Sequence, residues 1–184
     1  ILFFVSGSIS AYKTYDLLRA WIKDQHEVQV VLTQGALRFV KPEVFTYLGA
    51  QKVHLPQDDF ISKNPGVLHV DLVKWCDRGV IAPLSAGLAS RLTKGQAGDL
   101  ASSIFLAWDK KKSLLLFPAM NSEMWTHPIL KKNLSSVQNL PWVSIINPTE
   151  GKLACGDIGP GKLVDVDIIK ELAYYLNPLK IINK

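Results

Sequence analysis

The chain has 184 residues, of which 48% are hydrophobic and 20% are charged, and its net charge is +5. A chain of this size and apolar content can bury a core as one domain. The longest basic run, Lys110–Lys112, lies between an apolar helix pattern and an apolar strand, so it indicates a solvated turn and argues against nucleic-acid binding. The positive balance is compatible with anionic small-molecule ligands.

Cysteine content and hydropathy bear on the cellular location. Two cysteines, Cys76 and Cys155, give neither a disulfide framework nor a CxxC motif. No apolar run approaches the ~18 residues of a membrane span, and no signal-peptide pattern is present. We therefore expect a cytoplasmic protein with free thiols that does not associate with membranes.

Short apolar runs alternate with helical patterns along the chain. Ile1–Val5 is continuously apolar, as in a strand buried on both faces of a parallel sheet, and Ala11–Lys23 has apolar residues at helical spacing. The same patterns predict further strands at 28–32, 52–55, 79–82, 114–117 and 142–146, helices at 42–48, 70–76, 86–93, 100–108, 129–137 and 168–176, and a loop at 57–68. The alternation predicts an α/β fold with a three-layer, doubly wound, mostly parallel sheet of about six strands. We expect one domain over residues 1–176, followed by a tail or linker at 177–184.

Four segments that follow predicted strands carry small, polar or reactive residues: 6–10, 83–87, 118–125 and 147–163. In open α/β sheets, ligands bind at the carboxyl ends of the strands. We therefore expect these four segments to converge on one crevice.

Ser6–Ser10 opens the first helix with one glycine and three serines. Backbone N–H groups and the positive end of the helix dipole favour a phosphate at such a position, although an ordinary serine-capped helix start explains the same residues. The segment lacks a GxGxxG fingerprint, so a mononucleotide fits better than a dinucleotide. Thr33, after the second predicted strand, could supply additional phosphate donors.

Three further residues could carry chemistry. His69 can accept a proton near neutral pH, although a lone histidine is more often structural or solvated. Asn121 follows the most apolar strand, where its amide can bind a ligand amide or carboxylate. Cys155 lies in Gly151–Leu163, which holds four glycines and a proline; this composition indicates either a loop that folds over a ligand or a plain surface loop. No metal site is predicted, because His, Cys and carboxylate side chains are not at ligand spacing.

Five motifs in chain order resemble those of the flavin-dependent cysteine decarboxylases. They are Ser-Gly-Ser-Ile-Ser-Ala-Tyr-Lys at 6–13, His-Val-Asp-Leu-Val-Lys-Trp-Cys-Asp at 69–77, Ala-Pro-Leu-Ser-Ala at 82–86, Pro-Ala-Met-Asn with Met-Trp at 118–125, and Ala-Cys-Gly-Asp-Ile-Gly-Pro-Gly-Lys-Leu at 154–163. Each motif alone is a weak signal, whereas five in order at compatible spacing are highly specific. The resemblance runs from Val5 to about Leu163 and implies a flavoprotein fold of the Rossmann or flavodoxin type.

The resemblance also implies a cofactor and an assembly. The cofactor is FMN, and the subunits form homotrimers that could cluster into dodecamers, with the flavin between subunits. The residues implied to hold FMN are Gly7, Ser8, Ile9 and Thr33 around the phosphate, and Phe39, Ser85, Ala86, Ala119 and Met120 around the flavin.

The activity implied by the resemblance is decarboxylation of 4′-phosphopantothenoylcysteine to 4′-phosphopantetheine in coenzyme A biosynthesis. The flavin oxidises the cysteine thiol to a thioaldehyde, CO2 leaves, and the resulting enethiol is reduced again. By resemblance, His69 is the base that assists thiol oxidation, Asn121 orients the carboxylate, and Cys155 donates a proton to carbon while Gly151–Leu163 closes over the substrate. The residues implied to contact substrate are Asn121, Met124, Ala154, Cys155, Gly156 and Lys162.

The chain departs from the family pattern in three places, one of which is Gly98-Asp99-Leu100 where an acidic residue, asparagine and leucine are more usual. Gly87 stands where the family usually has an asparagine beside the flavin, and Lys162 stands where arginine is common. Residues 177–180 resemble the junction to the ligase domain that many bacterial relatives carry.

Three other functions within the wider superfamily remain open. They are a peptidyl-cysteine decarboxylase of lantibiotic maturation, a flavin prenyltransferase, and a non-catalytic flavin-binding regulatory subunit. Cys155 argues against the first, because those enzymes stop at the enethiol and lack this cysteine. The joint presence of His69, Asn121 and Cys155 argues against a protein that has lost catalysis.

Overall fold

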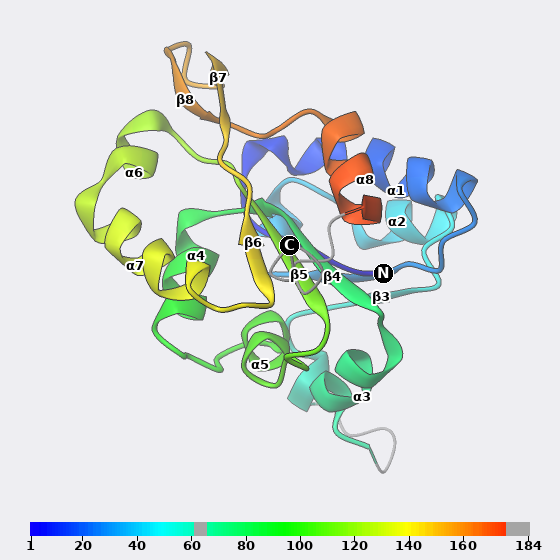
Figure 1. The fold of residues 1–184 in the computed structure, drawn as a ribbon. Coiled ribbons are helices and arrows are strands. Elements are labelled where there is room, and N and C mark those ends of the chain that lie inside the picture. The colour runs from blue at the N-terminus through cyan, green and yellow to red at the C-terminus, as the bar shows by residue number, and fades with distance from the viewer. Residues whose placement is uncertain (61–65, 176–184) are drawn as a thin grey trace.

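A six-stranded parallel sheet forms the centre of the molecule (Figure 1). The computed structural model describes residues 1–60 and 66–175. The strands are β1 (Leu2–Val5), β2 (Gln29–Leu32), β3 (Lys52–His54), β4 (Arg78–Leu84), β5 (Ser113–Pro118) and β6 (Val143–Ile145). They lie in the order β3-β2-β1-β4-β5-β6, and every neighbouring pair is parallel. The predicted α/β, doubly wound, six-stranded fold is confirmed.

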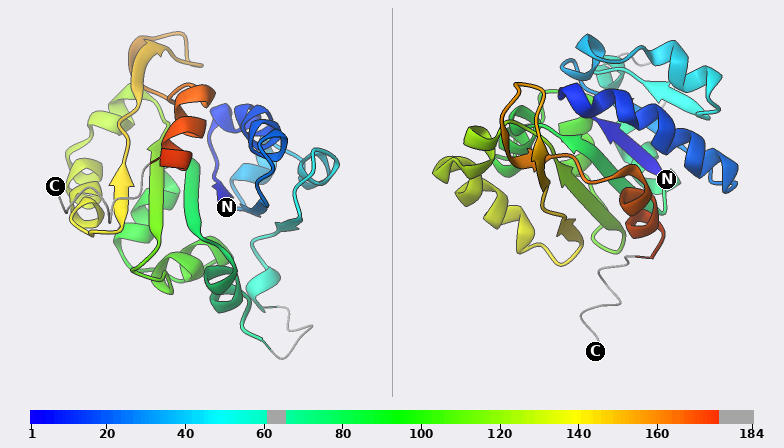
Figure 2. Two further views of the ribbon diagram at one scale, coloured as in Figure 1. Left: turned by 45° about the vertical axis from the view of Figure 1, so that its right-hand side comes forward. Right: turned by 90° about the horizontal axis from the view of Figure 1, so that it is seen from above.

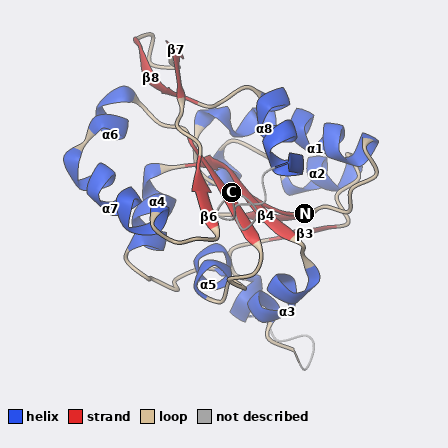
Figure 3. Cartoon of the chain, viewed as in Figure 1, coloured by secondary structure: helices blue, strands red, loops and turns tan. Residues whose placement is uncertain are grey.

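Helices cover both faces of the sheet, which gives three layers (Figures 2 and 3). The helices are η1 (Ile9–Lys13), α1 (Thr14–Lys23), η2 (Ala36–Arg38), α2 (Pro42–Tyr47), η3 (Asp58–Phe60), α3 (Leu68–Trp75), α4 (Ala86–Thr93), α5 (Leu100–Leu106), α6 (Ser122–Thr126), α7 (Pro128–Gln138) and α8 (Val166–Tyr175), where η marks a 3-10 helix. Within the described residues, no helix has the length and apolar character that crossing a membrane requires.

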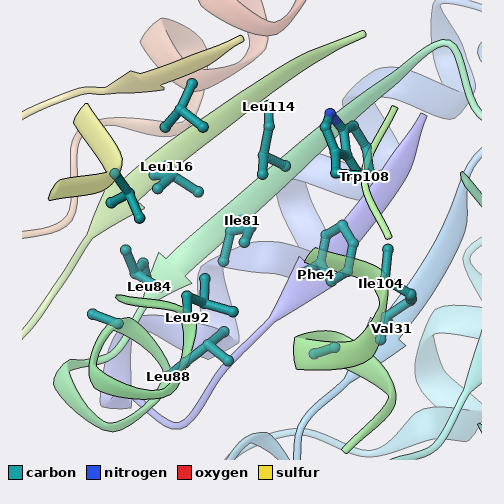
Figure 4. Packing of buried hydrophobic residues seen from close by; sticks show 14 of the residues in the cluster. Phe4, Val31, Ile81, Leu84, Leu88, Leu92, Ile104, Trp108, Leu114 and Leu116 are labelled. Carbon is teal, nitrogen blue, oxygen red and sulfur yellow. The ribbon is translucent and has the colours of Figure 1, made fainter. Parts of the chain in front are cut away.

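Alternate residues of each central strand pack against opposite helical layers, because successive side chains of a strand point to opposite faces. Phe3 and Leu115 are fully buried on the face covered by α1, α2 and α8. Phe4 and Leu114 are buried on the other face, against α3, α4, α5 and α7, together with Trp108 (Figure 4). The two-sided burial explains why the sequence shows continuous apolar runs here and no polar alternation.

The structure corrects the prediction for Gly151–Leu163. In place of an irregular loop, β7 (Thr149–Lys152) and β8 (Ile158–Lys162) form a two-stranded antiparallel hairpin outside the main sheet, at the top of Figure 1. The glycines and the proline hide the strand pattern, since neither residue type favours strands.

Smaller differences concern helix boundaries and short helices. The first helix begins as η1 at Ile9 and becomes α1 at Thr14, and the short helices η2, η3 and α6 were not predicted. The predicted tail at 177–184 and part of the loop predicted at 57–68 lie outside the described residues.

A buried histidine at the edge of the sheet makes stability depend on pH. His54 is 1% exposed, and its Nε2 lies 2.8 Å from Gln29 Oε1, while Gln29 Nε2 donates to Gln51 Oε1 at 3.0 Å. Burial, reinforced by the Lys52 charge, lowers the pKa of His54 from 6.5 to about 4. The imidazole is therefore neutral in the folded protein at pH values where the unfolded chain is already protonated.

We predict that His54→Gln flattens the acid limb of the stability profile. Because the pKa of His54 is lower in the folded protein than in the unfolded chain, its titration costs no stability above pH 6.5. As the pH falls from 6.5 to about 4, the unfolded chain takes up the proton first, and the folded protein loses stability. The wild type should lose about 2–3 kcal/mol more than His54→Gln between pH 7 and pH 4, measured by urea unfolding at each pH. Parallel losses in the two proteins would contradict the prediction.

Candidate active site

A cavity of about 1250 Å³ opens at the carboxyl ends of β1, β2, β4 and β5. This is the topological switch point of the sheet, where the chain turns to β2 on one side of β1 and to β4 on the other, and where open α/β sheets bind ligands. All four segments that were predicted to converge contribute lining residues, from Gly7 in the first to Leu163 in the last. The predicted crevice is therefore confirmed.

A buried serine joins the two strands at the switch point. The Ser6 hydroxyl donates to the Pro83 carbonyl at 2.7 Å and accepts from the Ser85 backbone N–H at 2.7 Å. Ser6 is fully buried, where hydrogen bonds are strongly favoured over unpaired polar groups. The end of β1 is thereby fixed against the loop that leads from β4 into α4.

The loops after β1 and β2 touch through two glycines. A Cβ placed on Gly7 would lie 2.9 Å from the backbone carbon of Gly35, which is closer than non-bonded carbon atoms approach. Glycine is therefore required at position 7 for the two loops to form one continuous wall. Thr33 Oγ1 accepts from the Ala36 backbone N–H at 3.3 Å and stabilises the second of these loops.

All nine residues predicted to hold FMN line this single cavity: Gly7, Ser8, Ile9, Thr33, Phe39, Ser85, Ala86, Ala119 and Met120. They come from four separate segments of the chain, each of which follows a strand, so the fold and not sequence proximity brings them together. Ile9 and Phe39 are 56% and 43% exposed, which is high for large apolar side chains. An apolar ring system is the kind of ligand that such a lining accommodates.

Asn121 caps the short helix α6 with one end of its amide. Its Oδ1 accepts from the Met124 backbone N–H at 3.1 Å, and both residues line the cavity. Because the oxygen is engaged by the helix, the Nδ2 group is left to donate to a ligand acceptor such as a carboxylate oxygen.

The β7–β8 hairpin covers the cavity from one side and is attached to the body at its base. Met120 N–H donates to the Gly161 carbonyl at 3.0 Å, and Ser122 Oγ donates to the Pro160 carbonyl at 2.7 Å. A Cβ on Gly161, whose φ is +129, would lie only 2.2 Å from the Met120 carbonyl oxygen. This position therefore requires glycine, both for its left-handed backbone and for the close approach.

The tip of the hairpin presents the exposed thiol. Cys155 is exposed and lines the cavity, and its Sγ donates to Asp157 Oδ2 at 3.3 Å. Gly156, with a φ of +98, completes the turn between them but does not line the cavity. The other thiol, Cys76, is buried, and burial raises its pKa to about 11, so Cys155 is the reactive cysteine of the two.

Four cationic side chains line the cavity, against one carboxylate: Lys13, Arg91, Lys152, Lys162 and Asp99. The Asp99 carboxylate is paired with Arg91, Oδ2 to Nη2 at 3.2 Å, so the lining carries a positive excess that favours anionic ligands.

Several residues that line the cavity were not among the site residues predicted from the sequence. Lys13 ends the first motif, and Lys152 lies inside the glycine-rich segment. Both could have been predicted, because both segments were already expected to contact a ligand. Arg91 follows Gly87 and Leu88 at helical spacing, and all three line the cavity. Pro56 and Gln57 also line the cavity, but the sequence did not indicate them. Pro56 lies between a predicted strand and a predicted loop, and Gln57 only begins that loop.

His69 does not line this cavity in the single chain. It lies in the first turn of α3, and Figure 1 and the left view of Figure 2 show α3 and the β7–β8 hairpin at opposite ends of the molecule. The structure thus brings Asn121 and Cys155 together at one cavity and leaves His69 apart from them.

With this geometry in view, the chain can be placed among known proteins. The flavoprotein family model matches residues 1–175. The chain belongs to the flavoprotein family. A curated phosphopantothenoylcysteine decarboxylase of Oryza sativa is 36% identical over 92% of this chain and 76% of its own length. The bifunctional coenzyme A biosynthesis protein CoaBC of Bacillus subtilis is 35% identical over 94% of this chain, and the match spans 42% of that protein.

Two solved structures share the fold of this chain. One, a PPC decarboxylase mutant complexed with pantothenoylaminoethenethiol, has a TM-score of 0.84 and 33% identity, with 94% of each chain covered. The FMN-binding protein AtHal3 has a TM-score of 0.80 and 34% identity, with 94% of this chain and 93% of that chain covered.

Proposed function

We propose that this flavoprotein uses FMN to decarboxylate 4′-phosphopantothenoylcysteine to 4′-phosphopantetheine in coenzyme A biosynthesis. The observation that carries the proposal is one cavity that gathers all nine expected flavin contacts together with Asn121 and Cys155. The names of the relatives described above point to the same substrate. Because the chain spans under half of the bifunctional relatives, their second activity is not assigned to it.

The residues of the cavity fit FMN. Its volume of about 1250 Å³ exceeds the ~300–1,000 Å³ of ordinary small-molecule sites, which leaves room for a substrate beside a cofactor. Ser8, at the start of η1, and the neighbouring wall of Gly7 and Gly35 would hold the phosphate, and Phe39 and Met120 would contact the ring. The chemistry that FMN supplies when bound is reversible two-electron exchange with the thiol-bearing carbon, which creates the electron sink that loss of CO2 requires.

Asn121 would orient the group that leaves. Its Nδ2 is the donor left over after Oδ1 has capped α6, and it would donate to the substrate carboxylate. Holding the carboxylate in one orientation lowers the entropic cost of breaking the carbon–carbon bond.

Cys155 would complete the reaction. After CO2 has left, the enethiol carbon must gain a proton, and the Cys155 thiol lines the cavity on the hairpin that covers it. The hairpin would also exclude water from the reacting carbon.

Lysines on the same hairpin would hold the phosphate of the substrate. Lys152 on β7 and Lys162 on β8 both line the cavity, and the Lys162 side chain lies over Gly151, within 2.9 Å of where a Cβ would be. Two lysines can neutralise a phosphate monoester even without the bidentate fork of an arginine.

His69 would act on a site of the neighbouring subunit. Its position away from the cavity of its own chain is the arrangement that a shared site between subunits of a homotrimer requires, and trimers could cluster into dodecamers.

We further propose that residues 1–176 form one FMN-binding domain and that 177–184 are a tail or the start of a linker. A cytoplasmic location completes the proposal and agrees with two free thiols.

The direct test of the proposal combines a spectrum and a product. Purified protein should bind FMN, show an oxidised-flavin spectrum, and release CO2 from 4′-phosphopantothenoylcysteine with 4′-phosphopantetheine as the product seen by mass spectrometry. A product two hydrogens lighter would identify an enzyme that stops at the enethiol, and a colourless protein that FMN cannot reconstitute would overturn the proposal.

We predict that Cys155→Ser separates the two halves of the reaction. CO2 release should continue, whereas the yield of 4′-phosphopantetheine should fall about 100-fold or more, because a hydroxyl is a much weaker acid than a thiol. Cys76→Ser is the matched control, since Cys76 is buried outside the cavity, and it should leave the product unchanged. Normal product yield from Cys155→Ser would remove its role as proton donor.

A further inference from the structure

Asp59 and His69 form a partly buried pair that neither composition nor motif revealed. Asp59 Oδ1 lies 2.7 Å from His69 Nδ1 and also accepts from the His69 backbone N–H at 3.3 Å. The side chain of Asp59 is 5% exposed, whereas that of His69 is 28% exposed. The carboxylate thus lies beneath the ring, and the ring still reaches the surface.

The pair fixes which nitrogen of His69 is free. A carboxylate oxygen only accepts, so in the neutral imidazole Nδ1 must carry the proton and the lone pair must lie on Nε2. Within residues 1–60 and 66–175, Nε2 has no hydrogen-bond partner. The ring therefore presents an unprotonated nitrogen toward the surface and cannot rotate without breaking the bond to Asp59.

The carboxylate itself is held in place by its own helix and by the segment before it. Asp58, the preceding residue, accepts from the Leu55 backbone N–H through Oδ2 at 2.7 Å, and the Pro56 carbonyl accepts from the Leu100 backbone N–H at 3.3 Å. Asp58 thus closes the turn into η3, while Asp59 faces His69. The two adjacent carboxylates therefore have different partners: Asp58 binds the Leu55 backbone, and Asp59 binds His69.

We propose that Asp59 is a positioning residue that holds His69 as the Nδ1–H tautomer, with Nε2 directed at the thiol of a substrate bound to a neighbouring subunit. This inference rests on the proposed function. In the proton transfer the substrate S–H bond breaks and an Nε2–H bond forms, leaving a thiolate and an imidazolium. The Asp59 carboxylate stabilises the imidazolium, as a buried acid does for histidine bases generally.

The tautomer of His69 is a direct readout that needs no substrate. In protein labelled with 15N-histidine, the His69 signals, assigned by their loss in His69→Gln, should show that the neutral ring carries its proton on Nδ1 and none on Nε2. In Asp59→Ala the proton should move to Nε2, the form that imidazole favours without an acceptor at Nδ1. A neutral wild-type His69 ring that carries its proton on Nε2 would overturn the proposal outright.

The functional readout compares two neighbouring carboxylates. Asp59→Ala should lower kcat for CO2 release about 100-fold or more with little change in KM or in bound FMN, since Asp59 does not line the cavity. Asp59→Asn, which retains an acceptor for the His69 backbone N–H, should also be slow. Asp58→Asn, which keeps an acceptor for the Leu55 backbone N–H, is the matched control and should keep both the tautomer and the rate.

The outcomes separate this inference from the proposed function. Asp59 variants that keep wild-type kcat despite a changed tautomer would refute the positioning role while the proposed function stands. Wild-type protein that binds FMN but releases no CO2 would refute the proposed function, and the tautomer measurement would still decide whether Asp59 holds the ring.

Discussion

The buried Ser6 hydroxyl is the interaction on which the geometry of the cavity depends. It donates a hydrogen bond to the Pro83 carbonyl and accepts one from the Ser85 N–H. These bonds set the separation of β1 and the start of α4 at the switch point, where the order of successive strands reverses. Gly7 and Gly35 continue this junction by letting the loops after β1 and β2 meet. The result is a cavity floor with one side of small and polar residues, which suits a phosphate, and one apolar side, which suits a ring system.

The hairpin brings the exposed thiol of Cys155 to the cavity without being part of the main sheet. Its base is fixed through Met120, Ser122 and Gly161, while Cys155 at its tip is exposed. Because the base is anchored and the tip lies in solvent, the proposed movement of the tip over a ligand would leave the main sheet undisturbed. Asn121 lies between the two parts, because it caps α6 beside the hairpin base and lines the cavity.

The apolar runs were enough to predict the central sheet, because strands buried on both faces leave an unmistakable pattern, as at Leu114–Phe117. The convergence of four loops followed from the parallel topology alone. The hairpin strands could not be predicted, since Gly151, Gly159 and Pro160 are poor strand formers whose pairing is visible only in three dimensions. No sequence motif indicates the contact between Asp59 and His69, which are ten residues apart. Sequence periodicity also could not show that His69 lies outside the cavity of its own chain.

The central claim is that His69 and the cavity which it serves belong to different chains, and subunit complementation tests it most directly. His69→Asn and Asn121→Ala chains would be co-expressed with different tags, purified as mixed assemblies, and assayed for CO2 release from 4′-phosphopantothenoylcysteine. In a cyclic trimer containing both chains, one of the three sites pairs an intact cavity with an intact His69, so activity should recover to about one third of wild type. Mixed trimers no more active than either variant alone would contradict a site shared between subunits.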